Sequence, residues 1–273
     1  MSAPVVTVDI QNHIADVRLN RPEKMNALND AMFEEIAGAA DELKNNRAVR
    51  AVVLSGNGGA FCAGLDMASL QGSSTLRDIF SKGSEHFPNY FQRPGMAWKE
   101  IPVPVIAAMH GTAFGGGLQI ALGADIRVAA PGTRMSVMEI KWGLVPDMSA
   151  SQTLRDLVRL DVAKDLSFTG RIFDAEEALE LGIVTALAED AHTEAMRRAE
   201  AIAAQNPDAI AHIKYLFDNS WHGDSKAGLR LEERAQARVI MRANQIEAVS
   251  AQFEKRTANF AEREFDDFDE LAQ

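Results

Sequence analysis

Alternating and periodic apolar positions divide the first part of the chain into three predicted elements. The runs VVTVDI and IADVRL flank QNH, and their period of two predicts a β-hairpin over residues 5–19. The segment NDAMFEEIAGAADELKNN has helical spacing, with Asn29 or Asp30 as the N-cap. The short apolar run AVVLSG at residues 51–56 is typical of a buried strand.

Strand, loop and helix signals then alternate through most of residues 50–190. The glycine-rich stretch GNGGAFCAGLD predicts a loop that enters a turn of helix. Residues 71–100 are polar, glycine-bearing and typical of an irregular, mobile surface segment. The next signals predict a buried strand (VPVIAAM), a loop (HGTAFGGG), a short helix (GLQIALGA) and a strand (DIRVAA). This alternation predicts an α/β core with parallel strands.

The pattern changes near residue 190, where long helical signals begin. TEAMRRAEAIAAQ, DAIAHIKYLFDNS and residues 225–260 all have helical spacing. Apolar positions of the last run fall mostly on one stripe, which consists of Leu229, Leu231, Ala235, Val239, Met241, Ile246, Val249 and Phe253. Such a stripe needs a partner surface, either the protein's own core or a second subunit. We expect a core at residues 1–200 and a helical oligomerisation region at residues 201–273, which ends in a solvated acidic tail.

Composition narrows the class of protein. The 273 residues are 47% apolar and 25% charged, which suits one large domain with an appendage or two small domains and disfavours a disordered or fibrous chain. A net charge of −11 disfavours non-specific nucleic-acid binding. The most apolar region, residues 101–130, contains prolines, charges and a glycine cluster, so we expect no membrane span. One cysteine, Cys62, excludes an internal disulfide, and the start of the chain lacks a signal-peptide pattern, so we expect a cytoplasmic protein.

Several familiar catalytic signatures are absent from the sequence. It contains no G-x-x-x-x-G-K-[ST], H-E-x-x-H, G-x-S-x-G or paired C-x-x-C motif, and HGTAFGGG lacks the spacing of dinucleotide-binding loops. No histidines are spaced like metal ligands, so we expect no metal site. His110 precedes a glycine at a predicted strand end, where a core or turn histidine is the simpler interpretation.

Two glycine-bearing turns and two carboxylates remain as candidate chemistry. FCAGLD at residues 61–66 and FGGGLQ at residues 114–119 each lie where the chain enters a helix. The first N–H groups of a helix have no backbone acceptor, and glycine lets a ligand approach them, so the pair of turns predicts an oxyanion site. Tight turns and close helix packing are the alternative. Glu139 and Asp147 lie in largely apolar sequence, where a carboxylate needs a partner or a function.

Five motifs resemble, in the same order, those of the enoyl-CoA hydratase/isomerase (crotonase) family. They are LNRPEKMNALN, FCAGLD, HGTAFGGGLQIALGADIRVAA, GLVPD and FEKRTANF, and the resemblance runs from about residue 5 to residue 260. It implies a spiral of β-β-α turns followed by a helical trimerisation region, and hence a homotrimer or a dimer of trimers. It also implies an enzyme for acyl-CoA thioesters, with CoA only as part of the substrate and with no metal or redox cofactor.

The resemblance also assigns site residues by position. It places the thioester oxygen on the backbone N–H groups of Leu65 and Gly116, and each such donor stabilises an enolate by roughly 3–4 kcal/mol. The remaining residues expected to bind the substrate are Lys24, Asn26, Ala27, Leu28, Ala63, Gly64, Asp66, Gly115, Gln119 and Lys255. Among the basic residues, Arg21, Lys24 and Lys255 are candidate phosphate contacts, with a solvated surface charge as the alternative for each.

The acids decide which reaction the resemblance implies. Hydratases of the family carry two glutamates, of which the second aligns with Glu139 and the first with Gln119, which cannot ionise. Dienoyl-CoA isomerases of the family carry an acid at the position of Asp147, where hydratases typically carry glycine. We therefore expect Glu139 to remove a proton and either Glu139 or Asp147 to return it, since two nearby carboxylates can divide acid and base roles.

Three functions stay open from the sequence. A double-bond isomerase is favoured by the acids. An enoyl-CoA hydratase would need Gln119 to position the water, and a catalytically silent member would bind acyl-CoA without turnover. Asp147 also has a structural interpretation, as the cap of the helix that begins in MSASQTL.

Overall fold

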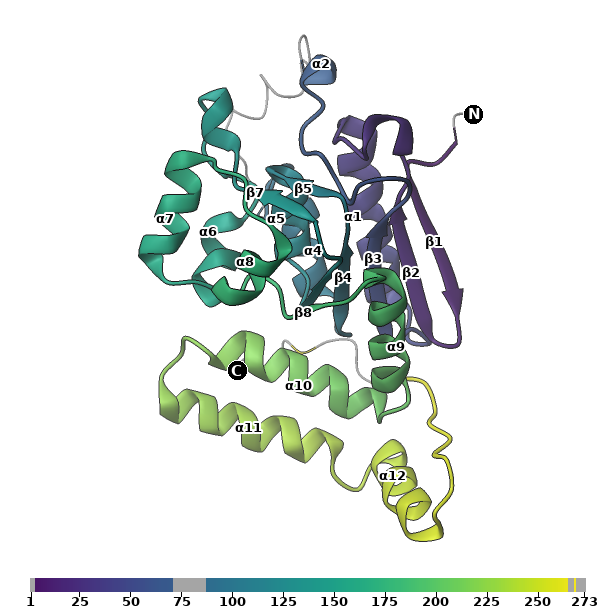
Figure 1. Cartoon of the computed structure of the whole chain (residues 1–273). Helices are drawn as coiled ribbons and strands as arrows, with labels where there is room; N and C mark the ends of the chain where they lie inside the picture. The colour runs from purple at the N-terminus through teal and green to yellow at the C-terminus, as the bar shows by residue number, and fades with distance from the viewer. Residues whose placement is uncertain (1–2, 71–86, 265–267, 269–273) are drawn as a thin grey trace.

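Parallel strands form the centre of the fold (Figure 1). The computed structural model describes residues 3–70, 87–264 and 268. One sheet has the order β1-β2-β3-β4-β6-β8, with strands at Val6–Gln11, Ile14–Leu19, Ala51–Gly56, Val105–Met109, Ile126–Ala129 and Ala186–Leu187. The β1–β2 pair is antiparallel and every following pair in this sheet is parallel. A second parallel sheet pairs β5 (Thr112–Phe114) with β7 (Arg134–Ser136).

The first two predicted elements are confirmed. In the hairpin, Gln11 pairs with Ile14, and the positive φ angles of Asn12 and His13 make the tight turn that joins two twisted strands. The first helix, α1, spans Asp30–Asn45. Asn29 is its N-cap, because its side-chain oxygen accepts the Met32 N–H at 3.0 Å.

The chain then winds as the predicted β-β-α spiral. After β3, Cys62 pairs with Ala113 of β5 and the chain enters α2 (Met67–Leu70). After β4 come β5 and α5 (Gly116–Leu122), and after β6 come β7 and the 3-10 turn η2 (Glu139–Trp142). Each turn thus adds one strand to the large sheet and one extended segment to the small sheet. The remaining elements of this half are η1 (Pro22–Lys24), α6 (Ala150–Thr153), η3 (Leu154–Asp156), α7 (Leu160–Thr169) and α8 (Ala175–Leu181).

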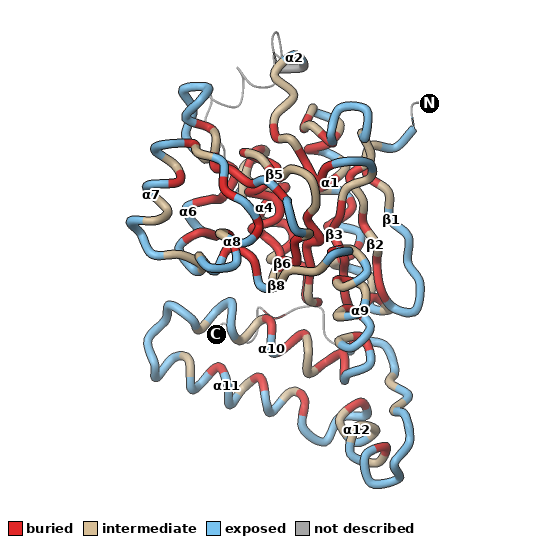
Figure 2. The backbone as a smooth tube through the Cα atoms, in the orientation of Figure 1, coloured by how far each residue is buried: buried red, intermediate tan, exposed pale blue. Residues whose placement is uncertain are grey.

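Helices cover both faces of the large sheet, because successive strand residues point in opposite directions. Val52 and Leu54 join the core that contains α1, α4 (Arg93–Glu100) and α5, whereas Val53 faces α9 (Ala191–Ala203). The buried face of α9 consists of Ala191, Ala195, Ala199 and Ala203. These small side chains let the helix lie close to the sheet. Figure 2 shows that burial is concentrated in the central strands.

The helical signals after residue 190 are confirmed, but the last run is not continuous. It forms α11 (Ser225–Val239) and α12 (Ala243–Glu254), and Met241, with φ of +62°, breaks it. Together with α10 (Pro207–Ser220) these helices lie below the sheet in Figure 1. Packing on the protein's own core accounts for part of the apolar stripe, and the subunit interface stays a prediction for the rest. Leu231, Ala235 and Val239 are buried within the chain, while Leu229, Met241, Ile246, Val249 and Phe253 are exposed.

Two predictions about loops are wrong. Residues 71–86 lie outside the described residues, but α4 occupies the end of the segment predicted to be irregular. Its glycine, Gly95, serves close packing, because a Cβ there would lie 2.6 Å from Ser149 Oγ. The second error is β5, which lies within HGTAFGGG and pairs with β7 through only three residues, too few for a periodic signal. In the described part of the chain, no helix is long and apolar enough to cross a membrane.

Candidate active site

Backbone hydrogen bonds bring three of the predicted site segments together. Leu28 donates its N–H to the Gly64 carbonyl oxygen at 2.8 Å, and Asp66 donates to the Leu28 carbonyl oxygen at 2.9 Å. On the other side of the same turn, Phe114 donates to the Cys62 carbonyl oxygen at 3.0 Å. KMNALN, FCAGLD and FGGGLQ therefore form one contiguous backbone unit.

The two glycine turns approach too closely for side chains to fit between them. Gly64 has φ of +90°, and a Cβ there would lie 2.6 Å from the Phe114 carbonyl oxygen and 3.8 Å from the Gly116 nitrogen. Gly116 begins α5, where an N–H has no intrahelical acceptor. In the described part of the chain, neither the Leu65 N–H nor the Gly116 N–H donates to a protein acceptor. Both groups are left to bind a ligand oxygen.

Glu139 lies against this backbone unit. It is 7% exposed, and a Cβ at Gly115 would lie 3.2 Å from its Oε1. Gln119 Nε2 donates to Oε1 at 2.6 Å, whereas the buried Oε2 has no hydrogen-bond partner among the described residues. Burial raises the pKa of the Glu139 carboxyl more than the bond from Gln119 lowers it, and the charge of Asp147 raises it further. Such a carboxylate is suited to accept a proton beside an oxyanion.

Asp147 does not cap a helix, so that interpretation is wrong. The following helix, α6, begins at Ala150, whose N–H donates to Gln119 Oε1 at 3.0 Å, and Ser149 at the N-cap position makes no side-chain cap. Asp147 itself is exposed, yet the surrounding protein removes enough of its hydration to raise its pKa. The charge of Asp147 contributes to the raised pKa of Glu139 less than burial does.

The predicted CoA residues divide into structural and accessible groups. Asn26 is fully buried, and its side chain binds the backbone of the glycine-rich loop, including the Ala60 carbonyl oxygen at 2.8 Å. Arg21 pairs with Asp66 and also donates to the Ala27 carbonyl oxygen. Leu28 is buried, whereas Ala27, Ala63 and Asp66 are half-buried and Lys24 is exposed. Asn26 and Arg21 therefore shape the loop that the other residues line.

Lys255 is not brought to the site within one chain. It is the C-cap of α12, in the left-handed conformation with φ of +55°. Figure 1 shows α12 at the opposite end of the molecule from α2 and β5. The family resemblance grouped Lys255 with Lys24, and the fold separates them within one chain.

A groove of about 500 Å³ begins at Asp147. Gln92, Met96 and Glu100, spaced four residues apart on one face of α4, form one wall. The rest of the lining is Phe87, Pro88, Pro146, Asp147, Ser149, Ser151 and Gln152. These α4 residues were not among the predicted site residues, because α4 itself was not predicted. Their spacing of four residues was the signal that could have indicated a shared helix face.

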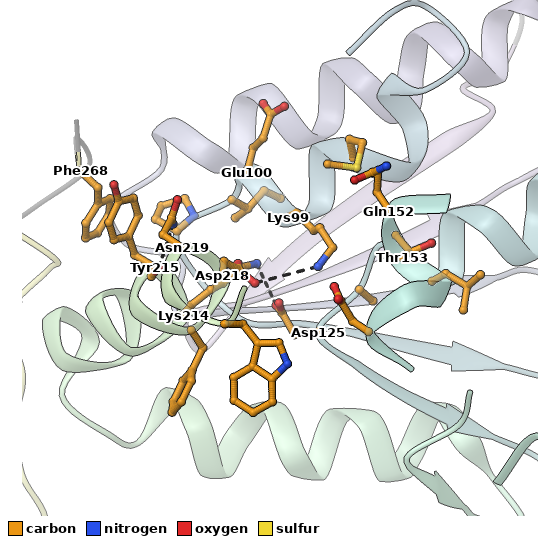
Figure 3. A pocket seen from close by; sticks show the side chains of 18 of the residues that line it. Lys99, Glu100, Asp125, Gln152, Thr153, Lys214, Tyr215, Asp218, Asn219 and Phe268 are labelled. Carbon is orange, nitrogen blue, oxygen red and sulfur yellow. Dashed lines mark hydrogen bonds and ion pairs between the residues drawn. The ribbon is translucent and has the colours of Figure 1, made fainter. Parts of the chain in front are cut away.

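A larger cavity, of about 910 Å³, lies between α10 and the sheet (Figure 3). Glu139 and the two glycine turns are not among the described residues that line it. Its charged side chains form ion pairs, with Lys214 Nζ 2.8 Å from Asp125 and Lys99 Nζ 4.0 Å from Asp218. These pairs join α10 to the core. We place the candidate chemistry at Glu139 because of its burial, its unpaired oxygen and its contact with the glycine turns, since it is not among the described residues that line either space.

Comparisons with known proteins show what the sequence and the fold of this chain resemble. A family model described as enoyl-CoA hydratase/isomerase matches residues 9–263. Enoyl-CoA hydratase EchA19 of Mycobacterium tuberculosis is 31% identical over 96% of this chain and 98% of its own length. The human mitochondrial enoyl-CoA hydratase domain-containing protein 2 is 33% identical over 90% of this chain and 85% of its own. The crystal structure of an enoyl-CoA hydratase from Bacillus anthracis superimposes with a TM-score of 0.86 at 30% identity, over 94% of this chain and 98% of that one.

Proposed function

The chain belongs to the enoyl-CoA hydratase/isomerase family, and from this premise we propose that it shifts a C=C double bond of an enoyl-CoA thioester by proton transfer. One observation carries the proposal: Glu139 is buried beside the two glycine turns with Oε2 unpaired. A base at this point removes a proton from the carbon next to the thioester, and the carbonyl oxygen becomes an enolate oxygen. CoA enters as part of the substrate, and the step needs no metal or redox cofactor.

The enolate oxygen binds the N–H groups of Leu65 and Gly116. Two features support this assignment: both groups lack a protein acceptor, and the glycine turns exclude side chains between them. Fixed donors stabilise developing charge without reorganisation, and each contributes roughly 3–4 kcal/mol in sites of this kind. Both act on the transition state more than on the neutral thioester, so they raise kcat.

Asp147 returns the proton further along the acyl chain, or Glu139 returns it. The groove supports a role for Asp147, because this carboxylate and three residues of the α4 wall line it and it has the size of a small-molecule site. The raised pKa values of both acids favour a state in which one holds the proton and the other does not.

Hydration is the second candidate function. The names of the relatives favour it, since EchA19 and the Bacillus anthracis structure are both named enoyl-CoA hydratase. It requires Gln119 to position the water and Glu139 to carry all the proton transfer. The amide of Gln119 already binds Glu139 and Ala150, and this is the observation against hydration.

Mass spectrometry in deuterated water distinguishes these functions. The protein is incubated with 2-enoyl-, 3-enoyl- and 3,5-dienoyl-CoA. Deuterium uptake with a moved double bond and no added water supports isomerisation, and a product heavier by one water supports hydration. Glu139→Gln is expected to lower turnover by roughly 10²–10⁴-fold while acyl-CoA still binds. Binding without any turnover by the wild type would indicate a silent acyl-CoA-binding protein.

A trimer or a dimer of trimers is the proposed assembly. Leu229, Ile246, Val249 and Phe253 support it, because they leave an apolar face of α11 and α12 exposed in the single chain. Light scattering that gives the mass of a monomer at working concentration would contradict it. The cytoplasmic location expected from the sequence stays a prediction.

A further inference from the structure

We propose that Gln119 is a positioning residue, whose amide holds Oε1 of Glu139 and leaves Oε2 as the atom that exchanges a proton with the substrate. The inference rests on the proposed function, which makes Glu139 the base. It assigns Gln119, which was expected to bind the substrate, a role that acts through Glu139 and determines how the base is presented.

The orientation of the Gln119 amide follows from its second partner. The Ala150 N–H can only donate, and it lies 3.0 Å from one end of the amide, so that end must be the oxygen. The NH₂ end then faces Glu139 Oε1 at 2.6 Å. Because Ser149 makes no side-chain cap, Gln119 satisfies the first N–H of α6 in its place. Gln119 thus joins the start of α6 to the carboxylate on η2.

This bridge distinguishes the two oxygens of Glu139. Gln119 is 1% exposed, so water does not compete for its bonds. With one oxygen held by an N–H, turning the carboxylate out of this plane would leave a buried donor unpaired, which costs about 1–3 kcal/mol, and a half-turn only exchanges two equivalent oxygens. Oε2 keeps a fixed direction and no partner among the described residues. A fixed direction is valuable because a misplacement of about 1 Å can cost roughly 10²-fold in rate.

A carboxyl group in place of the Gln119 amide would change the protonation of the site. In a Gln119→Glu variant, one oxygen of the new carboxylate could accept from Ala150, but the other oxygen would face Glu139 Oε1. Two carboxylates at that distance share one proton and titrate as a pair. Asp147 is the other charged group that acts on Glu139 among the described residues, and Lys141 on the same turn is exposed.

The first test is the pH profile of kcat/KM for Gln119→Glu, which keeps the shape of the side chain. In the wild type, activity rises as Glu139 loses its proton and then reaches a plateau. In the variant, the pair of carboxyl groups stays active while it holds one proton. When this last proton is lost, two adjacent carboxylates repel each other and activity falls. We expect a bell-shaped profile with a new fall at alkaline pH. A plateau like that of the wild type would overturn the proposal.

The second test is Gln119→Met, which removes both hydrogen bonds at nearly constant volume. We expect kcat to fall by roughly 10²-fold, with KM changed much less, because binding groups stay in place. Circular dichroism checks that the Gln119→Met variant folds. If it does not fold, the pH profile of Gln119→Glu remains the test. Gln205→Glu, at an exposed position just after α9, is the matched charge control and leaves both kcat and the pH profile unchanged.

The proposed function and this inference can fail separately. Normal turnover by Glu139→Gln would show that Glu139 is not the base and would overturn the proposed function. Normal kcat for Gln119→Met, together with a strong loss for Glu139→Gln, would leave the base in place and overturn only the positioning role.

Discussion

Arg21 and Asp66 form an ion pair, with Nη2 and Oδ2 3.1 Å apart and each side chain 13% exposed. The second Nη of the same guanidinium donates to the Ala27 carbonyl oxygen. Ala27 precedes Leu28, which pairs with Leu65 in a parallel bridge. The sequence offered Arg21 as a phosphate contact, but in the fold it braces the turn that carries one candidate oxyanion donor.

Arg21→Ala is expected to lower kcat by roughly 10-fold or more, because a loosened turn misplaces the Leu65 N–H. The free energy of unfolding should fall by about 2 kcal/mol with the loss of charged hydrogen bonds. Steady-state kinetics and urea unfolding measure the two effects. Glu23→Ala, exposed on the neighbouring η1, is the control and should change neither. An increase in KM alone would favour a phosphate contact instead.

Gly64→Ala is expected to damage both stability and catalysis. The φ of +90° is unfavourable for alanine, and its Cβ would lie 2.6 Å from the Phe114 carbonyl oxygen. Gly132 offers a matched control, since its φ is +74° but a Cβ there would meet nothing within 4 Å. Gly132→Ala should cost about 1–2 kcal/mol of unfolding free energy and leave kcat unchanged. Gly64→Ala should cost more and lower kcat by roughly 10²-fold; equal effects would refute a special role for this turn.

The raised pKa of Glu139 predicts how stability depends on pH. A carboxyl whose pKa is higher in the folded state binds more protons there than in the unfolded chain. The wild type should therefore lose stability as pH rises from near 4.5, the ordinary value, through the raised pKa. Glu139→Gln lacks this loss. Urea unfolding from about pH 4 to about pH 8 should show the variant gaining relative stability with pH, and parallel curves would contradict the shift.

Met96→Trp is expected to shorten the acyl chain that the enzyme accepts. Met96 is half-buried in the middle of the α4 wall, and the larger ring would fill the groove beyond Asp147. The kcat/KM for long acyl chains should fall by roughly 10-fold or more, while that for the shortest substrates stays the same. Met96→Leu conserves the volume and is the control. An equal loss for all chain lengths would mean that the acyl chain lies elsewhere.

Asp208→Ala is expected to release the end of the chain from α10. Asp208 is 1% exposed, and its two oxygens accept from Asn244 Nδ2 and the Glu264 N–H, both at 2.8 Å. Its removal leaves two donors unpaired, which costs about 2–4 kcal/mol of unfolding free energy. Asp224→Ala, at the exposed N-cap of α11, should cost only about 1 kcal/mol. Limited proteolysis should cut the Asp208 variant first near α12; similar protection in both variants would contradict this role.

Much of the fold could be predicted from local patterns in the sequence. The β1–β2 hairpin and α1 follow from periods of two and 3.6, and the Asn29 cap follows from a side-chain oxygen within reach of Met32. The prediction failed at α4, because Gly95 and a polar composition disfavour a helix in the sequence. In the fold, the burial of Trp98 stabilises the helix by more than these features destabilise it. That helix depends on contacts with residues more than fifty positions later, which no local pattern contains.

The sequence by itself determined the first hairpin, the central buried strands β3, β4 and β6, the two glycine turns and the presence of a carboxylate at residue 139. Only the tertiary structure decided that Gln119 faces both Glu139 and Ala150, that Arg21 is a brace, and that Lys255 lies away from the site within one chain. The reason is physical. Periodicity fixes which face of an element is buried, whereas a hydrogen bond depends on the relative position and direction of groups 20 or more residues apart.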